Sequence, residues 1–207
     1  MINHVWGLAH HPDKEWRNIS NEHETVSHLY TSHVLWLAAI PVVSTFIGTT
    51  QFGWTFGGED TIKVSMESGL SLGILFYVLI LTAVTIVGSL IHGLARKYPN
   101  CPSRNECIVF AGYIATPMFL SGLFAIYPMI WLCTLACIMG ICYTGYLLYR
   151  GTPSFLGISN QQGFIISSTT LAIGVLVLEV LLAAVVLLWS LGADNTIIWN
   201  LTLLHKY

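Results

Sequence analysis

Five long apolar runs constrain what this chain can fold into more than any other feature of its sequence. They lie at about 31–50, 69–94, 107–126, 128–149 and 164–190. A helix needs roughly 20 consecutive apolar residues to cross about 30 Å of hydrocarbon. Each run is long enough, so the sequence predicts an all-α membrane protein with five transmembrane helices.

The composition agrees with a membrane protein and argues against a nucleic-acid partner. Of the residues, 55% are hydrophobic and 9% are charged, whereas soluble domains carry about 25% charged residues. The formal net charge is -2, and lysine and arginine form no cluster. Because a basic patch is needed to attract phosphate backbones, we do not expect nucleic acid as a partner.

The apolar runs divide the chain into three parts, which are residues 1–29, 30–191 and 192–207. The first part is polar, and its His11-Pro12 pair is typical of a helix start, with Trp16 and Ile19 on one face of the helix that follows. We expect a short amphipathic helix on the membrane surface, with Trp16 in the headgroup layer. The second part is the five-helix domain, and the third is a C-terminal tail.

Lysine and arginine predict the orientation of the chain in the membrane. With five spans the two termini lie on opposite sides. A cytoplasmic N-terminus places six of the eight basic residues inside, which are Lys14, Arg17, Arg96, Lys97, Arg104 and Arg150. It leaves Lys63 and Lys206 outside. Because basic residues are enriched in cytoplasmic loops, we expect residues 1–29 in the cytoplasm and the tail outside.

Several segments carry a resemblance to a known family, among them His4 to Leu8, Phe46 to Thr50, Phe110 to Tyr113, Ala115 to Pro117 and Gly145 to Tyr149. Together with the polar start and the five spans, they resemble the Yip family, the membrane proteins first known as partners of Ypt/Rab GTPases, and above all its bacterial inner-membrane members. The resemblance extends to about Trp189. It implies a five-helix fold in the bacterial inner membrane, and it names no reaction. The tail is not part of the resemblance, and the charge rule places it in the periplasm. Rab binding is not carried over, because residues 1–29 lack the acidic, leucine-rich signatures of the eukaryotic members.

Glu179 is the only acidic or basic residue well inside a predicted span, about fifteen residues into the fifth run. A charged carboxylate near the bilayer middle costs at least about 2.5 to 3.5 kcal/mol. No basic residue lies at matching depth, so we expect the neutral carboxyl. Candidate hydrogen-bond partners at similar depth are Thr82, Thr85, Thr116, Thr134 and the carbonyl freed by Pro117. Two interpretations stay open, an interhelical hydrogen bond and a site for a proton or cation.

Histidines and acids near the N-terminus raise the question of a metal site, since imidazole and carboxylate bind zinc and similar ions. The candidate ligands are Glu24, His28, His10, His11 and His92. On one regular helix Glu24 and His28 share a face, while His33 points nearly opposite Glu24. One helix therefore supplies two ligands at most. Because the sequence does not bring the others together, we assign no metal and no other cofactor.

Two further groups of residues bear on the chemistry of the spans. Pro41 and Pro117 lie about ten residues into the first and third runs, where each is expected to free a carbonyl and break its helix, and paired breaks can line a cavity. The hydroxyls of residues 167–170 are expected to bond to backbone carbonyls or to neighbouring helices. The sequence shows no recognisable set of a nucleophile, its base and an orienting group. We therefore predict no catalytic residue and no enzyme.

Two functions remain. The favoured one is a non-catalytic membrane scaffold or adaptor, which organises lipids, a membrane-protein partner or copies of itself. The alternative is a small channel or transporter for an ion, proton or metal that uses Glu179. The first is favoured because a pathway for polar solutes usually leaves more than one ionisable group inside the spans.

Overall fold

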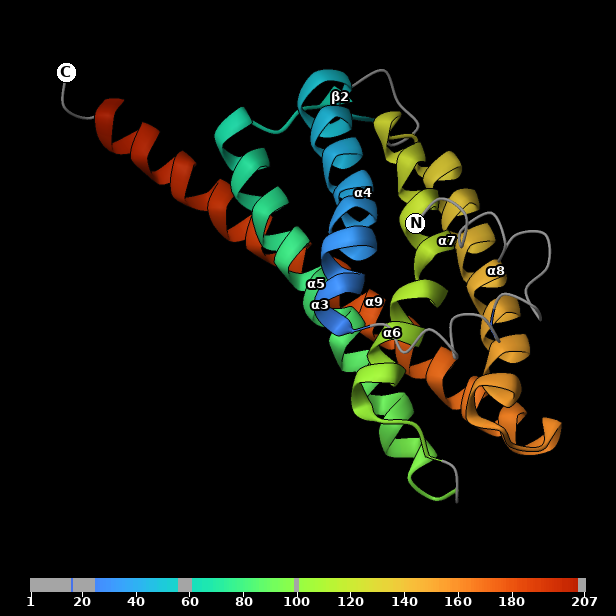
Figure 1. The fold of residues 1–207 in the computed structure, drawn as a ribbon. Coiled ribbons are helices and arrows are strands. Elements are labelled where there is room, and N and C mark those ends of the chain that lie inside the picture. The colour runs from blue at the N-terminus through green and yellow to red at the C-terminus, as the bar shows by residue number, and fades with distance from the viewer. Residues whose placement is uncertain (1–15, 17–24, 56–60, 99–100, 205–207) are drawn as a thin grey trace.

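The structure is a computed structural model, and it describes residue 16 and residues 25–55, 61–98 and 101–204. Within these residues, five helical segments are long and apolar enough to cross a membrane, and they form one bundle (Figure 1). They are Val26–Phe52, Met66–Ala95, Arg104–Ile126, Ile130–Leu156 and Asn160–Ala184. The predicted all-α fold with five spans is confirmed.

The first span contains two π-helical turns, one on each side of an α-helix. It begins with α3 (Val26–Leu29), whose first turn is capped by the Thr25 hydroxyl. The π-helical turn η1 (Tyr30–Val34), the helix α4 (Leu35–Ile47) and the π-helical turn η2 (Gly48–Phe52) follow. Because a π turn holds one residue more than an α turn, it rotates the side chains beyond it relative to a regular helix.

A short hairpin leads from the first span to the second. Strands β1 (Trp54–Thr55) and β2 (Thr61–Ile62) pair antiparallel. Gly53 precedes β1 with φ 84°, in a region of backbone space that favours glycine. The second span, α5 (Met66–Ala95), then begins after Ser65, whose hydroxyl caps its first turn.

The third span is broken near its middle. Its first helix, α6 (Arg104–Ile114), begins with a capping box. The helix stops before Ala115, and α7 (Thr116–Ser121) begins a new one with Pro117 in its first turn. The chain then tightens into the 3-10 helix η3 (Gly122–Ile126). Proline has no backbone N–H and its ring crowds the carbonyl four residues earlier, which explains a break at this position.

The last two spans differ strongly in length. The fourth, α8 (Ile130–Leu156), packs against α7. Gly157, with φ 61°, turns the chain toward α9 (Asn160–Leu204). This helix has 45 residues and is about 67 Å long at 1.5 Å per residue. It contacts α5 and α8, crosses the bundle obliquely and stands apart from the other helices at its C-terminal end (Figure 1). The helix thus continues beyond residue 191 into the predicted tail, 192–207.

Glycines let the helix backbones approach one another closely. A Cβ atom built on Gly88 of α5 would lie 2.5 Å from the Ile108 Cα atom of α6. One built on Gly122 of η3 would clash with Pro41 of α4. Lipid tails are as apolar as the side chains, so close packing of this kind is a main source of helix association in membranes.

Trp16 is fully buried in the core of the bundle. Its ring packs on Phe110, with the ring centroids 4.7 Å apart, and Phe110 stacks on Phe155. Gly151 of α8 leaves room for the indole, because a Cβ atom there would lie 2.7 Å from the Trp16 Cε2 atom. The prediction that Trp16 lies in the headgroup layer is therefore wrong, since α6 and α8 enclose the side chain. Ile19, on the same expected surface helix, lies outside the described residues.

Candidate functional site

Glu179 lies on the exposed side of α9. It belongs to the fifth span, Asn160–Ala184. Among the side chains that the structure describes, none forms a hydrogen bond or an ion pair with its carboxyl. The acid that the sequence singled out is therefore presented outward by its helix and is not enclosed by the bundle.

The four threonines proposed as partners of Glu179 make other contacts or lie at the surface. Thr85 of α5 shares a 2.7 Å hydrogen bond with the Tyr30 hydroxyl. Thr82 of α5 donates a 2.8 Å hydrogen bond to the Val78 carbonyl. Thr134 of α8 is exposed. Thr116 is 3% exposed and bonds to a histidine of the first span. In the described part of the chain, no hydrogen bond joins any of them to Glu179.

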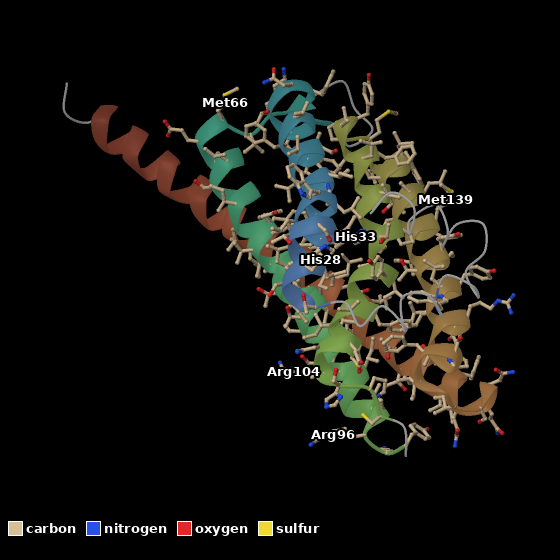
Figure 2. The ribbon with its side chains drawn as sticks, viewed as in Figure 1. His28, His33, Met66, Arg96, Arg104 and Met139 are labelled. Carbon is tan, nitrogen blue, oxygen red and sulfur yellow. The ribbon has the colours of Figure 1, made fainter. Side chains whose placement is uncertain are left out.

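His33 is the partner of Thr116, and sequence reasoning missed this pair. The His33 side chain is 1% exposed, and its Nε2 atom lies 2.9 Å from the Thr116 hydroxyl oxygen. The Tyr113 ring packs on the imidazole with ring centroids 4.7 Å apart. The pair joins the π-helical turn η1 to the break between α6 and α7, two irregular places that meet inside the bundle. Figure 2 marks His33 on the first span.

Two tyrosines add polar contacts between the first and second spans. The Tyr30 hydroxyl donates a 2.8 Å hydrogen bond to the Leu81 carbonyl and shares a 2.7 Å hydrogen bond with the Thr85 hydroxyl. The Tyr77 hydroxyl donates to the Leu35 carbonyl over 3.0 Å. In membranes such interhelical bonds contribute roughly 0.6 to 2 kcal/mol each. These polar groups therefore hold helices to one another.

The two prolines that the sequence marks as helix breaks behave differently. At Pro117 the α6 helix has ended and α7 has begun. Pro41 lies inside the continuous helix α4, and its ring is buried against Gly122 of η3. The break predicted at Pro41 is therefore not observed, and this proline instead packs the first span against the third.

Two of the five candidate metal ligands, His28 and His92, lie in the described part of the chain. His28 is exposed on α3. The His92 Nδ1 atom lies 3.0 Å from the Pro102 carbonyl oxygen and 3.7 Å from the Cys101 sulfur. Among the described residues, no group of three or more histidine, cysteine or acidic side chains could hold a metal ion. The other candidates, His10, His11 and Glu24, lie outside those residues.

Three of the four hydroxyls of residues 167–170 bond to backbone carbonyls or to α8, whereas the buried Thr170 hydroxyl has no hydrogen-bond partner among the described residues. Ser167 donates to the Leu148 carbonyl over 3.2 Å and lies 2.9 Å from the Thr152 hydroxyl oxygen. Tyr149 and Ser168 share a 2.9 Å hydrogen bond. These contacts fasten the first turns of α9 to α8 and leave its later turns to diverge.

Five membrane-length helices with polar contacts between them, and with Glu179 on an outer face, define an α-helical protein that crosses the membrane several times. Residues 6–181 match the Yip1 domain, and the chain belongs to the Yip family. The family resemblance seen in the sequence is thereby confirmed.

The chain is similar to two bacterial relatives. It is 56% identical over 191 residues to the inner membrane protein YohC of Escherichia coli strain K12, and the match covers 92% of this chain and 98% of that protein. The inner membrane protein YohC of Escherichia coli O6:H1 gives the same values. No solved structure matches the chain.

Proposed function

We propose that this Yip-family protein is a non-catalytic scaffold or adaptor of the bacterial inner membrane, which organises membrane-protein partners or lipids. The position of Glu179 carries the proposal. Its carboxyl is exposed on α9 within the fifth span. A polar group in hydrocarbon is costly and is stabilised by a hydrogen bond to another helix. An outward carboxyl therefore suits the recognition of a neighbour within the membrane.

The polar groups inside the bundle support a scaffold over a channel or transporter. His33 bonds with Thr116, and Tyr30 bonds with Thr85. These contacts join the first span to the third and the second. A transport pathway needs its ionisable groups on the route of the solute, whereas Glu179 faces away from the bundle.

The proposal includes an orientation with the N-terminus in the cytoplasm and the C-terminus in the periplasm. Arg96 and Arg104 lie toward the end of the bundle opposite Met66 (Figure 2). Lys97 is exposed next to Arg96, and Lys63 is exposed just before α5 begins. The excess of basic residues near Arg96 supports a cytoplasmic position for that end.

Cysteine labelling tests this orientation at the two ends of one helix. In a variant without the five native cysteines, we introduce Lys63→Cys or Lys97→Cys, two exposed lysines that flank α5. A maleimide that cannot cross the inner membrane is expected to label the first in intact cells, and the second only after permeabilisation. The reverse pattern would show that the N-terminus is periplasmic.

Flux and co-purification together test the scaffold. Purified full-length protein in proteoliposomes is expected to pass protons, alkali cations and zinc no faster than protein-free vesicles. When the protein is purified from native membranes, a partner protein is expected to co-purify with it in a fixed stoichiometry. Glu179→Leu should lower that recovery about tenfold, because one interhelical polar bond is lost.

The matched variant for both assays is Glu179→Gln, which keeps a hydrogen-bond donor and acceptor but cannot titrate. Scaffold function predicts that glutamine preserves recovery of the partner. Flux above the level of empty vesicles that disappears in Glu179→Gln would instead establish the channel or transporter.

A further inference from the structure

We propose that α9 pairs with α9 of a second copy of this chain in the same membrane, and that the two Glu179 carboxyls hydrogen-bond to each other across a two-fold axis. The inference rests on the proposed scaffold function and names the partner of its outward carboxyl.

The carboxyl needs a partner that the described part of its own chain does not supply. Glu179 is exposed within a membrane-spanning helix, and no described side chain bonds to it. A polar group in hydrocarbon is costly while it has no hydrogen-bond partner, because the lipid tails offer neither donors nor acceptors. A partner that offers both a hydrogen-bond donor and an acceptor would therefore stabilise this carboxyl most.

A second copy of this chain meets that requirement. Every copy inserts with the same orientation, so the Glu179 residues of any two copies lie at the same depth. A two-fold axis along the membrane normal brings identical residues of neighbouring helices together. A protonated carboxyl is both donor and acceptor, and two of them complement each other without any further group.

The face of α9 around Glu179 has the spacing of a helix-pairing seam. The exposed residues on this face are Ala172, Leu176, Glu179, Ala183 and Val186, at intervals of four, three, four and three. Such alternation is the 3.5-residue repeat along which two parallel helices pack. Small alanines on both sides of Glu179, at positions 172 and 183, allow the helix backbones to approach, and the single polar residue between them fixes the register.

The remainder of the fold leaves this face open. α9 uses other faces to contact α5 and α8, and its C-terminal end diverges from the bundle (Figure 1). Leu176 is 58% exposed and Val186 is 60% exposed. A second α9 helix can therefore reach the seam without displacing the helices that already pack on this one.

Disulfide cross-linking in native membranes tests the pairing at two adjacent alanines. In the cysteine-free chain, Ala183→Cys places a thiol on the seam, and Ala184→Cys places one about 100° around the helix. On mild oxidation, we expect the dimer yield from Ala183→Cys to exceed that from Ala184→Cys by about tenfold. Adding Glu179→Leu should lower the Ala183→Cys yield by about tenfold, whereas Glu179→Gln should preserve it.

The outcomes separate this inference from the scaffold function. Equal yields at the two alanines, or a yield that Glu179→Leu leaves unchanged, overturn the pairing. A Glu179-dependent cross-link to a different membrane protein also overturns it and leaves the scaffold standing. Circular dichroism and gel filtration of each variant establish that it is folded, which is expected because residue 179 lies on an exposed face. Ion flux in proteoliposomes tests the scaffold independently of these yields.

Discussion

Replacing Trp16 by alanine is expected to lower the free energy of unfolding by about 3 to 5 kcal/mol, the usual range for removing a buried tryptophan. The side chain is fully buried against Phe110, in space that Gly151 leaves for it. Alanine would leave a cavity between α6 and α8 where the indole now packs. Denaturant titration in detergent micelles, followed by circular dichroism, measures the loss.

Two matched variants serve as controls for this loss of stability. Trp131 is 84% exposed, so Trp131→Ala should change the stability by less than about 1 kcal/mol. Trp16→Phe keeps most of the volume and removes an indole N–H that has no partner among the described residues, so it should lose far less than Trp16→Ala. Equal stability of Trp16→Ala and Trp131→Ala would contradict the buried position of Trp16.

Gly88→Ala is expected to destabilise the protein by about 1 to 3 kcal/mol, because a Cβ atom at this position overlaps the backbone of Ile108, which a side-chain rotation cannot move away. That atom would lie 2.5 Å from the Ile108 Cα atom, 2.8 Å from its side-chain Cγ1 atom and 2.9 Å from its backbone nitrogen. α5 and α6 would have to separate along their contact. The same denaturant titration reports the change.

Gly93 provides the control on the same helix. A Cβ atom there would meet nothing within 4 Å. Alanine is a better helix former than glycine by roughly 0.5 to 1 kcal/mol, so Gly93→Ala should leave the stability unchanged or raise it. The two substitutions are thus expected to act in opposite directions. A stabilising Gly88→Ala would mean that the backbones of α5 and α6 are farther apart than the structure has them.

The spans were predictable because a bilayer requires apolar length and little else. The run at 69–94 became α5, and the run at 107–126 became the segment Arg104–Ile126. Trp16 was misplaced for a physical reason: one apolar face on a short helix fits a headgroup layer and a protein pocket equally well. The pocket of Trp16 is made by Phe110 and Gly151, which lie far away in the sequence.

The candidate site was predictable in part. Glu179 was recognisable as the one ionisable residue deep in a span. Residues 171–188 around it are otherwise apolar on all sides of the helix, so no pattern indicated which side faces outward. The bond between His33 and Thr116 was missed because the spacing argument assumed a regular helix through His33. The π-helical turn Tyr30–Val34 breaks that regularity and changes the direction of the side chain.

The burial of Trp16 also imposes an order on the biogenesis of the protein. Trp16 leaves the ribosome before any span does, yet its pocket is formed by Phe110 of α6 and Gly151 of α8. The indole can therefore dock only after the translocon has released the third and fourth spans into the bilayer. Residue 16 is thus synthesised early but reaches its final position late, and a chain that stalls before α8 leaves this aromatic ring without its pocket.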